Sequence, residues 1–480
     1  MRRIAVVGGG ISGLSAAFAI EQERIARSAP VEYVLFESSP RVGGVLVTDR
    51  VDGCLIEAGP DSFLTEKPWA ADLCRELGVG DQLIGSNDAD RKTYILVNGR
   101  LVVIPDGLMF MVPTKILPTV LSPLFTVGTK LHMAREWFHP PHTANGDETV
   151  AALVERHYGS EMVDRLADPL LSGVYGGEAS QLSVRAVLPR FAEMEAQYGS
   201  LGRAMLASRR KMAQMAKGAP RPLFTSLRDG MQQMVDSILT RLTQSFLRTS
   251  TSVTDLKPAP DGWIVAAAGR SEAFDGVILA VPTQAAATIV RSASPDLATE
   301  LATIQYSSSV TLTLGYGQSV RSALPPGFGF LVPRSEGKRM LACTFVHNKF
   351  PHRAPPDRAL VRCFLGGARD QEILESSDEE IVAVARKELR EILGLQADPL
   401  FARVYKWKGA MAQYGVGHLE RLERIESLRS QLPGLYLAGN GYRGIGVPDC
   451  VRSGLEAARN SLESLGLAQP LASSGARQPS

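Results

Sequence analysis

Near its N-terminus the chain reads Ile4-Ala-Val-Val-Gly8-Gly-Gly10-Ile-Ser-Gly13, and this stretch decides the fold. The apolar run at residues 4–8 predicts a fully buried parallel strand, and residues 11–21 predict the helix that follows it. A second apolar run, Val31–Glu37, predicts another strand. Strand, helix and strand in this order predict a βαβ unit.

The glycines of this stretch have the spacing of a dinucleotide-binding turn. Gly8 allows a tight turn, Gly10 lets the backbone approach a pyrophosphate, and Gly13 lets the helix pack closely on the strand. The start of the helix adds free N–H groups and a partial positive charge for phosphates. A chance glycine-rich turn is the competing interpretation. The residues predicted to contact the cofactor here are Gly8, Gly9, Gly10, Ile11, Ser12 and Gly13.

An acidic residue ends the second predicted strand. The carboxylate of Glu37 can accept hydrogen bonds from both ribose hydroxyls of an adenosine. Its charge would repel a 2′-phosphate. Together with the strand and helix around the glycines, Glu37 favours a dinucleotide ligand over a chance turn.

Two further turns follow the acid. Arg41-Val-Gly-Gly44 allows another close backbone approach and offers a cation to a phosphate. A plain surface turn is the alternative interpretation. The segment Gly59-Pro60-Asp61-Ser62 has little side-chain bulk, which suits a turn that lies against a flat ring.

The decisive partner of these turns lies far along the chain, at Leu435-Tyr-Leu-Ala-Gly439-Asn440-Gly-Tyr-Arg-Gly444-Ile-Gly446-Val-Pro448. A strand ending at Gly439 is followed by a glycine-rich turn, and Pro448 suits the first turn of a helix. The positive end of that helix can face the pyrimidine edge of an isoalloxazine ring. A nicotinamide enzyme has no need of such an element, so the ligand is predicted to be FAD.

Composition excludes several other classes of protein. The 480 residues carry a formal net charge of +2, whereas dedicated nucleic-acid binders have a strong basic excess. The five cysteines are widely spaced and show no metal-ligand pattern, so we expect small buried hydrophobic residues in a reduced, cytoplasmic setting, and no metal. The apolar tract Gly107–Phe125 contains three prolines and Lys115, which makes a spanning helix improbable. Peripheral contact with the inner face of the cell membrane stays open.

The predicted fold class is α/β, with three portions built from discontinuous segments. Residues 1–90, 223–285 and 430–468 are predicted to form a Rossmann-like FAD-binding domain. Residues 91–106 and 286–429 are predicted to form a substrate-binding domain with a mixed sheet, which includes a hairpin with an Asn98-Gly99 turn. Residues 107–222 are predicted to form an inserted helical domain, and residues 469–480 a disordered tail.

The motifs resemble those of the amine-oxidase-like flavoproteins and, more narrowly, the porphyrinogen oxidases of haem synthesis, which act on protoporphyrinogen IX or coproporphyrinogen III. The resemblance covers residues 4 to about 465. Its more specific part is Pro169-Leu-Leu-Ser-Gly173-Val-Tyr-Gly-Gly177, followed by Phe328-Gly-Phe-Leu-Val-Pro333, Phe350-Pro-His-Arg353, Gln413-Tyr414 and Gly444-Ile-Gly-Val-Pro-Asp-Cys450.

The resemblance implies a six-electron oxidation of a porphyrinogen to a porphyrin, with dioxygen as acceptor and release of hydrogen peroxide. No catalytic side chain is visible, and aromatisation drives the chemistry, so the protein has to place a meso carbon beside the flavin. Gly173 would contact the macrocycle, and Leu331, Phe345 and Phe350 are candidate apolar walls, although each is individually a better candidate for the core. The further FAD contacts implied are Glu37, Ser38, Arg41, Gly44, Val45, Gly59, Pro60, Asp61, Ser62, Val253, Trp407, Asn440, Ile445, Gly446 and Val447.

Two departures from the family pattern bear on the substrate. The mitochondrial-type enzymes hold a propionate with an arginine where this chain has Thr93, and Ala412 replaces a usual proline. The missing arginine resembles the bacterial branch that oxidises coproporphyrinogen III, and Val447-Pro448-Asp449-Cys450 and Val112-Pro-Thr-Lys115 point the same way, so we favour that substrate over protoporphyrinogen IX. Arg91 could still reach a propionate from a shifted strand.

Other functions remain to be weighed. Another amine oxidase or desaturase of the superfamily is the alternative enzyme, and a GDP-dissociation-inhibitor-like binding protein without flavin is the alternative outside catalysis. The intact glycine-rich turns and Glu37 disfavour the latter. The expected partners are a porphyrinogen, dioxygen and a downstream chelatase that takes up the product, with no nucleic acid and with a monomer or homodimer left open.

Overall fold

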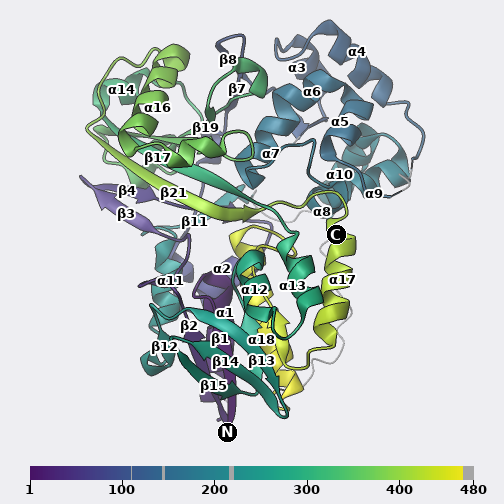
Figure 1. Cartoon of the computed structure of the whole chain (residues 1–480). Coiled ribbons are helices and arrows are strands. Elements are labelled where there is room, and N and C mark those ends of the chain that lie inside the picture. Colours follow the sequence, from purple (N-terminus) through teal and green to yellow (C-terminus); the bar gives the residue numbers. More distant parts are fainter. Residues whose placement is uncertain (27, 110, 143–145, 216–220, 469–480) are drawn as a thin grey trace.

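A computed structural model describes the chain except for residues 27, 110, 143–145, 216–220 and 469–480 (Figure 1). The predicted tail at 469–480 therefore lies outside the described residues. A parallel sheet occupies the lower part of Figure 1. Its strands, in spatial order, are β12 (Leu247–Arg248), β2 (Val31–Phe36), β1 (Arg2–Val7), β16 (Gly276–Leu279) and β22 (Leu435–Leu437).

The predicted βαβ unit is confirmed. α1 (Ile11–Ala26) connects β1 to β2, and the two strands pair in parallel with Ile4 opposite Tyr33. On its other side β1 pairs with β16, so that Ile4 also lies opposite Gly276. The centre of this sheet is buried on both faces, which explains why residues 4–7 of β1 and 33–36 of β2 are continuous apolar runs.

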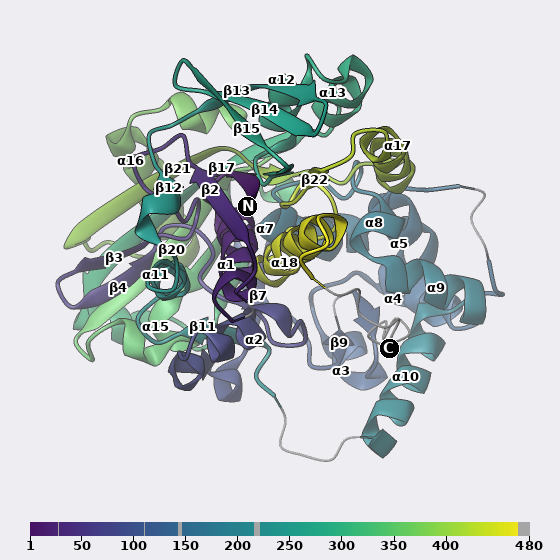
Figure 2. The ribbon, with the colours of Figure 1, turned by 90° about the horizontal axis from the view of Figure 1, so that it is seen from below.

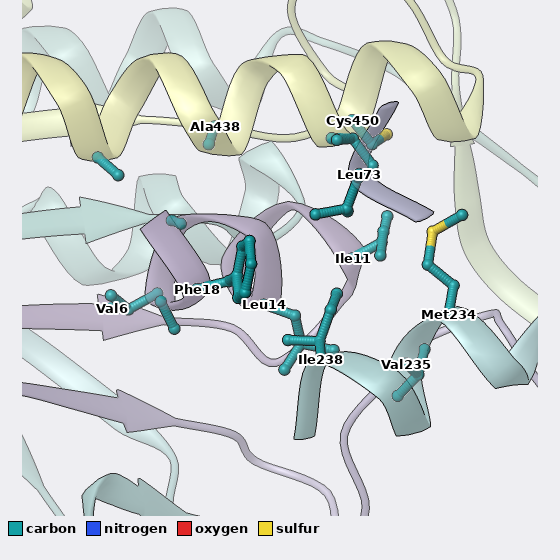
Figure 3. Packing of buried hydrophobic residues seen from close by; sticks show 14 of the residues in the cluster. Val6, Ile11, Leu14, Phe18, Leu73, Met234, Val235, Ile238, Ala438 and Cys450 are labelled. Atoms are coloured by element: carbon teal, nitrogen blue, oxygen red, sulfur yellow. The ribbon is translucent and has the colours of Figure 1, made fainter. Parts of the chain in front are cut away.

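One face of the parallel sheet is covered by helices from three distant parts of the sequence. α1 packs with α2 (Trp69–Glu76), α11 (Gln232–Leu239) and α18 (Val447–Ser464) in one apolar core. Figure 3 shows Phe18 and Leu14 of α1 between β1 and α11, with Leu73 and Cys450 beside them. Figure 2 shows α18 alongside α1.

α1 and α18 approach each other most closely at one glycine. A Cβ atom on Gly454 would stand 2.0 Å from the backbone oxygen of Ser12. Ser12 belongs to the first turn of α1, and Gly454 lies seven residues into α18, so this crossing fixes the start of one helix against the other.

The opposite face of the parallel sheet carries a three-stranded antiparallel sheet and three helices. The strands are β13 (Val253–Ala259), β14 (Gly262–Ala267) and β15 (Arg270–Phe274). The helices α12 (Thr283–Val290), α13 (Pro295–Ala302) and α17 (His418–Ser430) share an apolar core with them. The predicted boundaries assigned 286–302 and 418–429 to the substrate-binding portion, whereas these helices bury their apolar faces against the parallel sheet.

A second, mixed sheet forms the upper left part of Figure 1. Its spatial order is β21 (Phe401–Ala412), β17 (Tyr306–Gly317), β20 (Arg358–Gly366), β19 (Met340–Phe345), β18 (Gly329–Leu331), β7 (Thr93–Val97) and β8 (Arg100–Val103). β18 and β7 pair in parallel and the other pairs are antiparallel. α14 (Gln318–Ala323) and α16 (Asp378–Leu393) pack with one face of the sheet.

The turn between β7 and β8 has the conformation that the sequence predicts. Asn98 has φ = 49° and Gly99 has φ = 71°, as a type I′ turn requires. Shorter paired strands join the two large sheets. They are β3 (Thr48–Val51) with β4 (Cys54–Glu57), β5 (Phe63–Leu64) with β11 (Phe224–Leu227) and β6 (Leu83–Gly85), and β9 (Leu108–Met109) with β10 (Val112–Pro113).

A helical portion stands beside the mixed sheet, in the upper right part of Figure 1. Within the predicted helical domain, residues 160–175 form one helical run, whose middle section Val163–Ala167 is a π-helix. Such wide turns recur at functional sites. The helices are α3 (Ile116–Leu121), α4 (Val127–Glu136), α5 (Val150–Tyr158), α6 (Ser160–Met162), α7 (Asp168–Tyr175), α8 (Val184–Val187), α9 (Pro189–Tyr198) and α10 (Leu201–Met215).

A buried histidine ties the helices of this portion together. His157 of α5 lies 3.1 Å from a carboxylate oxygen of Glu136 on α4 and 3.0 Å from one of Glu195 on α9. Burial opposes the charged form of the imidazole, but its hydrogen bonds with both glutamates raise the pKa of His157 above the usual value. Glu136 also accepts hydrogen bonds from the hydroxyl of Ser200 and the backbone of Leu201, at the start of α10.

All five cysteine side chains are free and buried, which confirms that they are buried residues. No helix in the described part of the chain is long and apolar enough to cross a membrane.

The crossing of α1 and α18 yields a stability prediction. We expect Gly454→Ala to lower the free energy of unfolding by about 1–3 kcal/mol, because the new methyl group must displace the backbone at Ser12. Urea denaturation measures this change. The control is Gly128→Ala on the exposed side of α4, where the methyl group meets only the Thr126 hydroxyl at 3.9 Å and stability should stay level or rise slightly. Equal effects of the two substitutions would show that the crossing is not tight.

Candidate cofactor and substrate site

The glycines of the first turn are required for two different reasons. Gly8 has φ = 106°, and a Cβ atom there would stand 2.4 Å from the backbone oxygen of Ala280. A Cβ atom on Gly13 would stand 1.8 Å from the oxygen of Gly8, so both residues are fixed by packing within the protein. At Gly10 nothing lies within 4 Å of that position, which leaves open space beside the start of α1.

Glu37 lies directly against this turn. One carboxylate oxygen accepts a hydrogen bond from the backbone N–H of Gly9 at 2.7 Å. The other accepts hydrogen bonds from the backbone N–H and the hydroxyl of Ser39 at 2.8 and 2.7 Å, and from the hydroxyl of Ser38 at 3.3 Å. The carboxylate is therefore held in place at the carboxyl end of β2, where a ribose would have to lie.

The adenine end of the predicted site is formed by the return of the chain into β13. The backbone N–H of Thr251 donates to the carbonyl of Glu37 at 2.8 Å, and Val253 begins β13 two residues later. Val253 is half-buried and packs against the apolar core on this face of the sheet. This arrangement places Val253 and Glu37 near one another, as the resemblance implies.

The turn at Arg41–Gly44 lies beside the first turn. The N–H of Gly43 donates to the carbonyl of Gly9 at 2.7 Å, and a Cβ atom on Gly44 would be 3.3 Å from the Cα of Gly10. The exposed Arg41 side chain donates to the carbonyls of Val42 and Gly44 at 3.1 and 2.5 Å. These hydrogen bonds hold the Arg41 side chain against its own turn. Contact of Arg41 with a phosphate of the cofactor stays a prediction.

The turn at residues 57–62 is held from the side of the mixed sheet. The carbonyl of Ala58 accepts hydrogen bonds from the hydroxyl of Thr311 at 2.6 Å and from the indole N–H of Trp407 at 2.9 Å. Arg362 donates to the carbonyl of Gly59. A Cβ atom on Gly59 would stand 2.0 Å from the oxygen of Val45, so the turn also lies directly on Val45. Trp407 thus reaches the segment with which it was predicted to share a ligand.

Asp61 and Ser62 complete this turn. Both carboxylate oxygens of Asp61 are 3.0 Å from the ammonium of Lys349, and the hydroxyl of Ser62 donates to the same carboxylate at 2.6 Å. Burial acts against ionisation, but the ion pair with Lys349 and the nearby Arg362 hold the pKa of Asp61 well below its usual range. Asp61 is therefore an anchored anion, and its side chain points to Lys349.

The late glycine-rich turn is fixed by Tyr414, a residue of the Gln413-Tyr414 motif to which the sequence assigned no role. The hydroxyl of Tyr414 donates to the carbonyl of Asn440 at 2.6 Å, and the amide of Asn440 donates to the carbonyl of Ala410 at 2.8 Å. The Tyr414 ring stacks on His418 at 4.1 Å. Gly446 then forms the N-cap of α18, with Ile445 before it and Val447 as the first helical residue.

A lysine that no motif indicated lies at the start of α18. The ammonium of Lys67 is 2.7 Å from a carboxylate oxygen of Asp449, in the first turn of the helix. The Asp449 side chain also fills the space that a Cβ atom on Gly444 would need, at 2.3 Å. Lys67 and Asp449 are far apart in sequence, so no local pattern could have paired them.

The structure brings some of the predicted substrate residues together. The Cδ2 methyl carbon of Leu331 lies 3.7 Å from the position that a Cβ atom on Gly173 would take. Gly173 itself is exposed. Thr93 pairs with Gly329 on the neighbouring strand, two residues from Leu331. Arg91 precedes β7, and its half-exposed side chain stands 3.8 Å from Asp88.

α7, which carries Gly173, is clamped to the mixed sheet at both ends. At its start Asp168 pairs with Arg369, and at its end the side chain of Gln413 donates to the carbonyl of Tyr175 at 2.6 Å. Gln413 also donates to the hydroxyl of Ser307 at 3.0 Å. These contacts fix where Gly173 stands relative to β18.

The structure does not support two of the predicted substrate walls. Phe345 is completely buried in the core between the mixed sheet and α16, on the face opposite to that of Leu331. Phe350 is also completely buried, with the guanidinium of Arg353 4.6 Å and the ammonium of Lys349 5.3 Å from its ring centre. Alternation along β19 directs Phe345 inward, and the charged neighbours of Phe350 enclose it.

The residues present fit FAD. The open space at Gly10 and the start of α1 suit a pyrophosphate, and Glu37 suits a ribose. From Gly454, where the helices cross, α18 runs back over ~10 Å to its own N-terminus at the late turn. The two helix starts can therefore face one elongated ligand, with the 57–62 turn and Trp407 beside it.

The fold and these turns define a flavoprotein oxidoreductase with FAD as its cofactor. Within this class, the chain belongs to the flavin containing amine oxidoreductase family, which matches residues 11–462. The coproporphyrinogen III oxidase of Bacillus subtilis (strain 168) is 33% identical over 464 residues, which are 96% of this chain and 98% of that protein. A protein of the same name from Mycobacterium tuberculosis (strain ATCC 25618 / H37Rv) is 32% identical over 469 residues, covering 97% and 98%.

Two solved structures are also similar to this chain. A protein from Exiguobacterium sp. 255-15, to which protoporphyrinogen oxidase activity is attributed, has a TM-score of 0.85 at 29% identity and covers 97% of this chain and 99% of its own. A putrescine oxidase has a TM-score of 0.68 at 19% identity, covering 96% and 99%, which is a likeness of fold. The predicted α/β fold, FAD and oxidoreductase class are confirmed, and the non-catalytic alternative is not favoured.

The position of Glu37 yields a cofactor prediction. We expect Glu37→Ala to weaken FAD binding by ~1–3 kcal/mol, because a charge-assisted hydrogen bond to the ribose is lost. Fluorescence titration of the deflavinated protein with FAD measures the dissociation constant. Glu32→Ala, on the same strand, is the control and should bind FAD as the parent does. Unchanged affinity in the Glu37 variant would contradict this placement of the adenosine.

Proposed function

We propose that the protein oxidises coproporphyrinogen III to coproporphyrin III in haem biosynthesis, with dioxygen as acceptor and hydrogen peroxide as the second product. The observation that carries the proposal is the end-to-end similarity to proteins named coproporphyrinogen III oxidase. The geometry of α7 and β18 is consistent with it, because exposed Gly173 and Val174 lie beside Leu331 and offer an apolar ledge.

The side chains of the chain bind and orient the substrate in this proposal. Bound FAD supplies the hydride acceptor. Gly173, Val174 and Leu331 would hold one face of the macrocycle, and the clamps on α7 would keep that face at a fixed distance from the late turn. Aromatisation of the ring system favours the reaction without a general base.

Protoporphyrinogen IX is the alternative substrate. The mitochondrial protoporphyrinogen oxidase of Nicotiana tabacum is 28% identical over 494 residues, so that activity is close in sequence. Thr93, where an arginine would hold a propionate, favours coproporphyrinogen III. The side chain of Arg91 is half-exposed, and its guanidinium lies 3.8 Å from the carboxylate of Asp88. Arg91 can therefore also bind a substrate carboxylate at the edge of the site.

A competition assay tests the substrate. Purified protein is incubated with both porphyrinogens at equal concentration, and the porphyrin products are separated and quantified. We expect coproporphyrin III to form faster, with peroxide in proportion. Preferential formation of protoporphyrin IX would reverse the assignment, and amine-dependent peroxide without porphyrin would overturn the proposed function in favour of an amine oxidase.

Gly173 allows a test that separates activity from stability. Gly173 lies inside α7, so Gly173→Ala should hold or raise the melting temperature, because alanine stabilises a helix interior by roughly 0.5–1 kcal/mol. Gly173→Leu should lower kcat/KM at least about tenfold, since the longer side chain occupies the ledge. Both variants should retain the flavin absorption. Full activity of Gly173→Leu would show that the macrocycle binds elsewhere.

We also propose that the helical portion contacts the inner face of the cell membrane. An apolar surface on α3 and α4, here called the α3–α4 patch, consists of Leu117, Val120, Leu121, Val127 and Leu131, which are 50–73% exposed. No acidic residue occurs between positions 115 and 135, whereas Lys115, Lys130 and Arg135 are present. Apolar side chains with basic neighbours suit an anionic lipid surface. A chelatase that takes up the porphyrin is a further proposed partner.

Vesicle sedimentation tests the membrane proposal. The protein should bind vesicles of phosphatidylglycerol and phosphatidylcholine more tightly than vesicles of phosphatidylcholine alone. Leu121→Glu with Leu131→Glu should reduce binding to the anionic vesicles at least about tenfold, because each change places a charge in the lipid interface. Leu400→Glu is the control, since Leu400 is 56% exposed outside the patch. Equal binding by all three proteins would refute a role of the patch.

A further inference from the structure

Five charged side chains are buried together behind the 57–62 turn, on the side of the mixed sheet. This buried charge cluster consists of Glu57, Asp61, Lys349, Arg353 and Arg362. Their side chains are between 1% and 14% exposed. They come from β4, the 57–62 turn, α15 (Val346–Lys349), the short turn Pro351–Arg353, and β20.

The cluster contains more positive than negative charge. Lys349 pairs with Asp61 at 3.0 Å, and Arg353 pairs with Glu57 at 3.1 Å. Arg362 is the remaining cation, and its nearest carboxylate is Asp61 at 4.0 Å, already paired with Lys349. Two neighbouring groups add no charge: burial raises the pKa of Tyr405 to about 12, and burial lowers the pKa of His352. Burial also raises the pKa of Glu57 and lowers that of Lys349. These two shifts act on one anion and one cation, and the ion pairs with Arg353 and Asp61 oppose them, so two anions face three cations.

A buried cation without a partner of its own is costly, so its surroundings must compensate it. Arg362 donates to the backbone carbonyls of Ala58 and Gly59, and its Nε atom has no partner in the described structure. Two carbonyl dipoles do not cancel a full charge. The field of Arg362 therefore extends through the 57–62 turn to its other side.

Two peptide groups of the 57–62 turn are oriented with their carbonyl oxygens toward the buried charge cluster and their N–H groups away from it. In a trans peptide the N–H points opposite to the C=O. The carbonyl of Ala58 points at the sheet, where Thr311, Trp407 and Arg362 donate to it, so the N–H of Gly59 points away from the sheet. The carbonyl of Asp61 likewise accepts from Arg353 at 3.0 Å, which directs the N–H of Ser62 away.

We propose that the excess positive charge of the buried charge cluster, carried by Arg362 and relayed by the peptides 58–59 and 61–62, stabilises the electron-rich reduced state of the bound flavin. The proposal rests on the proposed function and on the placement of the flavin beside the 57–62 turn in the candidate site. It assigns Arg362 a positioning and electrostatic role that acts through the turn, so Arg362 need not touch the substrate. The cluster thereby makes the cofactor a stronger oxidant.

Variants of opposite charge change test this. Arg362→Gln removes the excess cation and should lower the equilibrium constant for two-electron reduction of the flavin about tenfold, which corresponds to about 30 mV. Glu57→Gln removes an anion, and Arg353 cannot lose its proton to compensate, so the constant should rise by a similar factor. The double variant restores one excess cation and should return close to the parent. Equilibration with a reference dye measures all three, and the dissociation constant for sulfite should change in the opposite sense to the reduction constant.

Two controls separate charge from packing. Arg358→Gln lies on the same strand, but Arg358 pairs with Asp357 at the surface, so it should leave the constant within about twofold of the parent. Arg362→Lys keeps the charge and should also stay near the parent. If Arg362→Gln does not fold, Arg362→Lys and Glu57→Gln still decide the matter.

The outcomes are distinct. Shifts of the same sign in Arg362→Gln and Glu57→Gln, or constants within twofold of the parent in both, would overturn the proposal and leave the cluster a structural element. Failure of the unmutated protein to oxidise a porphyrinogen while it holds flavin, with the charge variants still shifting in opposite senses, would overturn only the proposed function.

Discussion

The backbone oxygen of Ser12 occupies the space that any side chain at position 454 would need, and the rest of the site depends on that contact. It lets α18 lie directly on α1, so the two helix starts are held at a fixed separation. Each start provides N–H groups and a partial positive charge. With the parallel sheet beneath them, two short motifs from opposite ends of the sequence become one surface for an elongated, negatively charged cofactor.

Much of the parallel sheet could be predicted because its strands are buried on both faces. Residues 4–7 and 31–36, which are apolar except for Glu32, were predicted as strands and form the centre of the sheet. β21 was missed because Arg403, Lys406 and Lys408 interrupt its pattern on an edge strand that is only half-buried. α17 was missed because nearly half of its residues are charged and its hydrophobic residues give only a weak amphipathic pattern.

The site was predictable where geometry forces a particular residue type. Gly8 and Gly13 have to be glycine because of packing within the protein, whereas Gly10 borders open space. The sequence alone does not distinguish these two reasons for a glycine. Ion pairs that join distant segments gave no such signal, and this is why Lys67, Lys349 and Arg362 went unnoticed. Phe345 shows a related limit: alternation indicates which residues share a face of a strand, but not which face the helices will cover.

The order of strands in the parallel sheet has a consequence for the synthesis of the protein. β1, β2, β12 and β16 can assemble once the ribosome has passed residue 279, but the last place in the sheet is filled by β22, at Leu435–Leu437. α18 follows it, so the surface of α1 at Ser12 stays uncovered until then. Closing a loop of this length is slow compared with local folding. Flavin capture therefore belongs to the final stage of folding, and a chain that stalls before α18 would carry an intact first motif without a complete site.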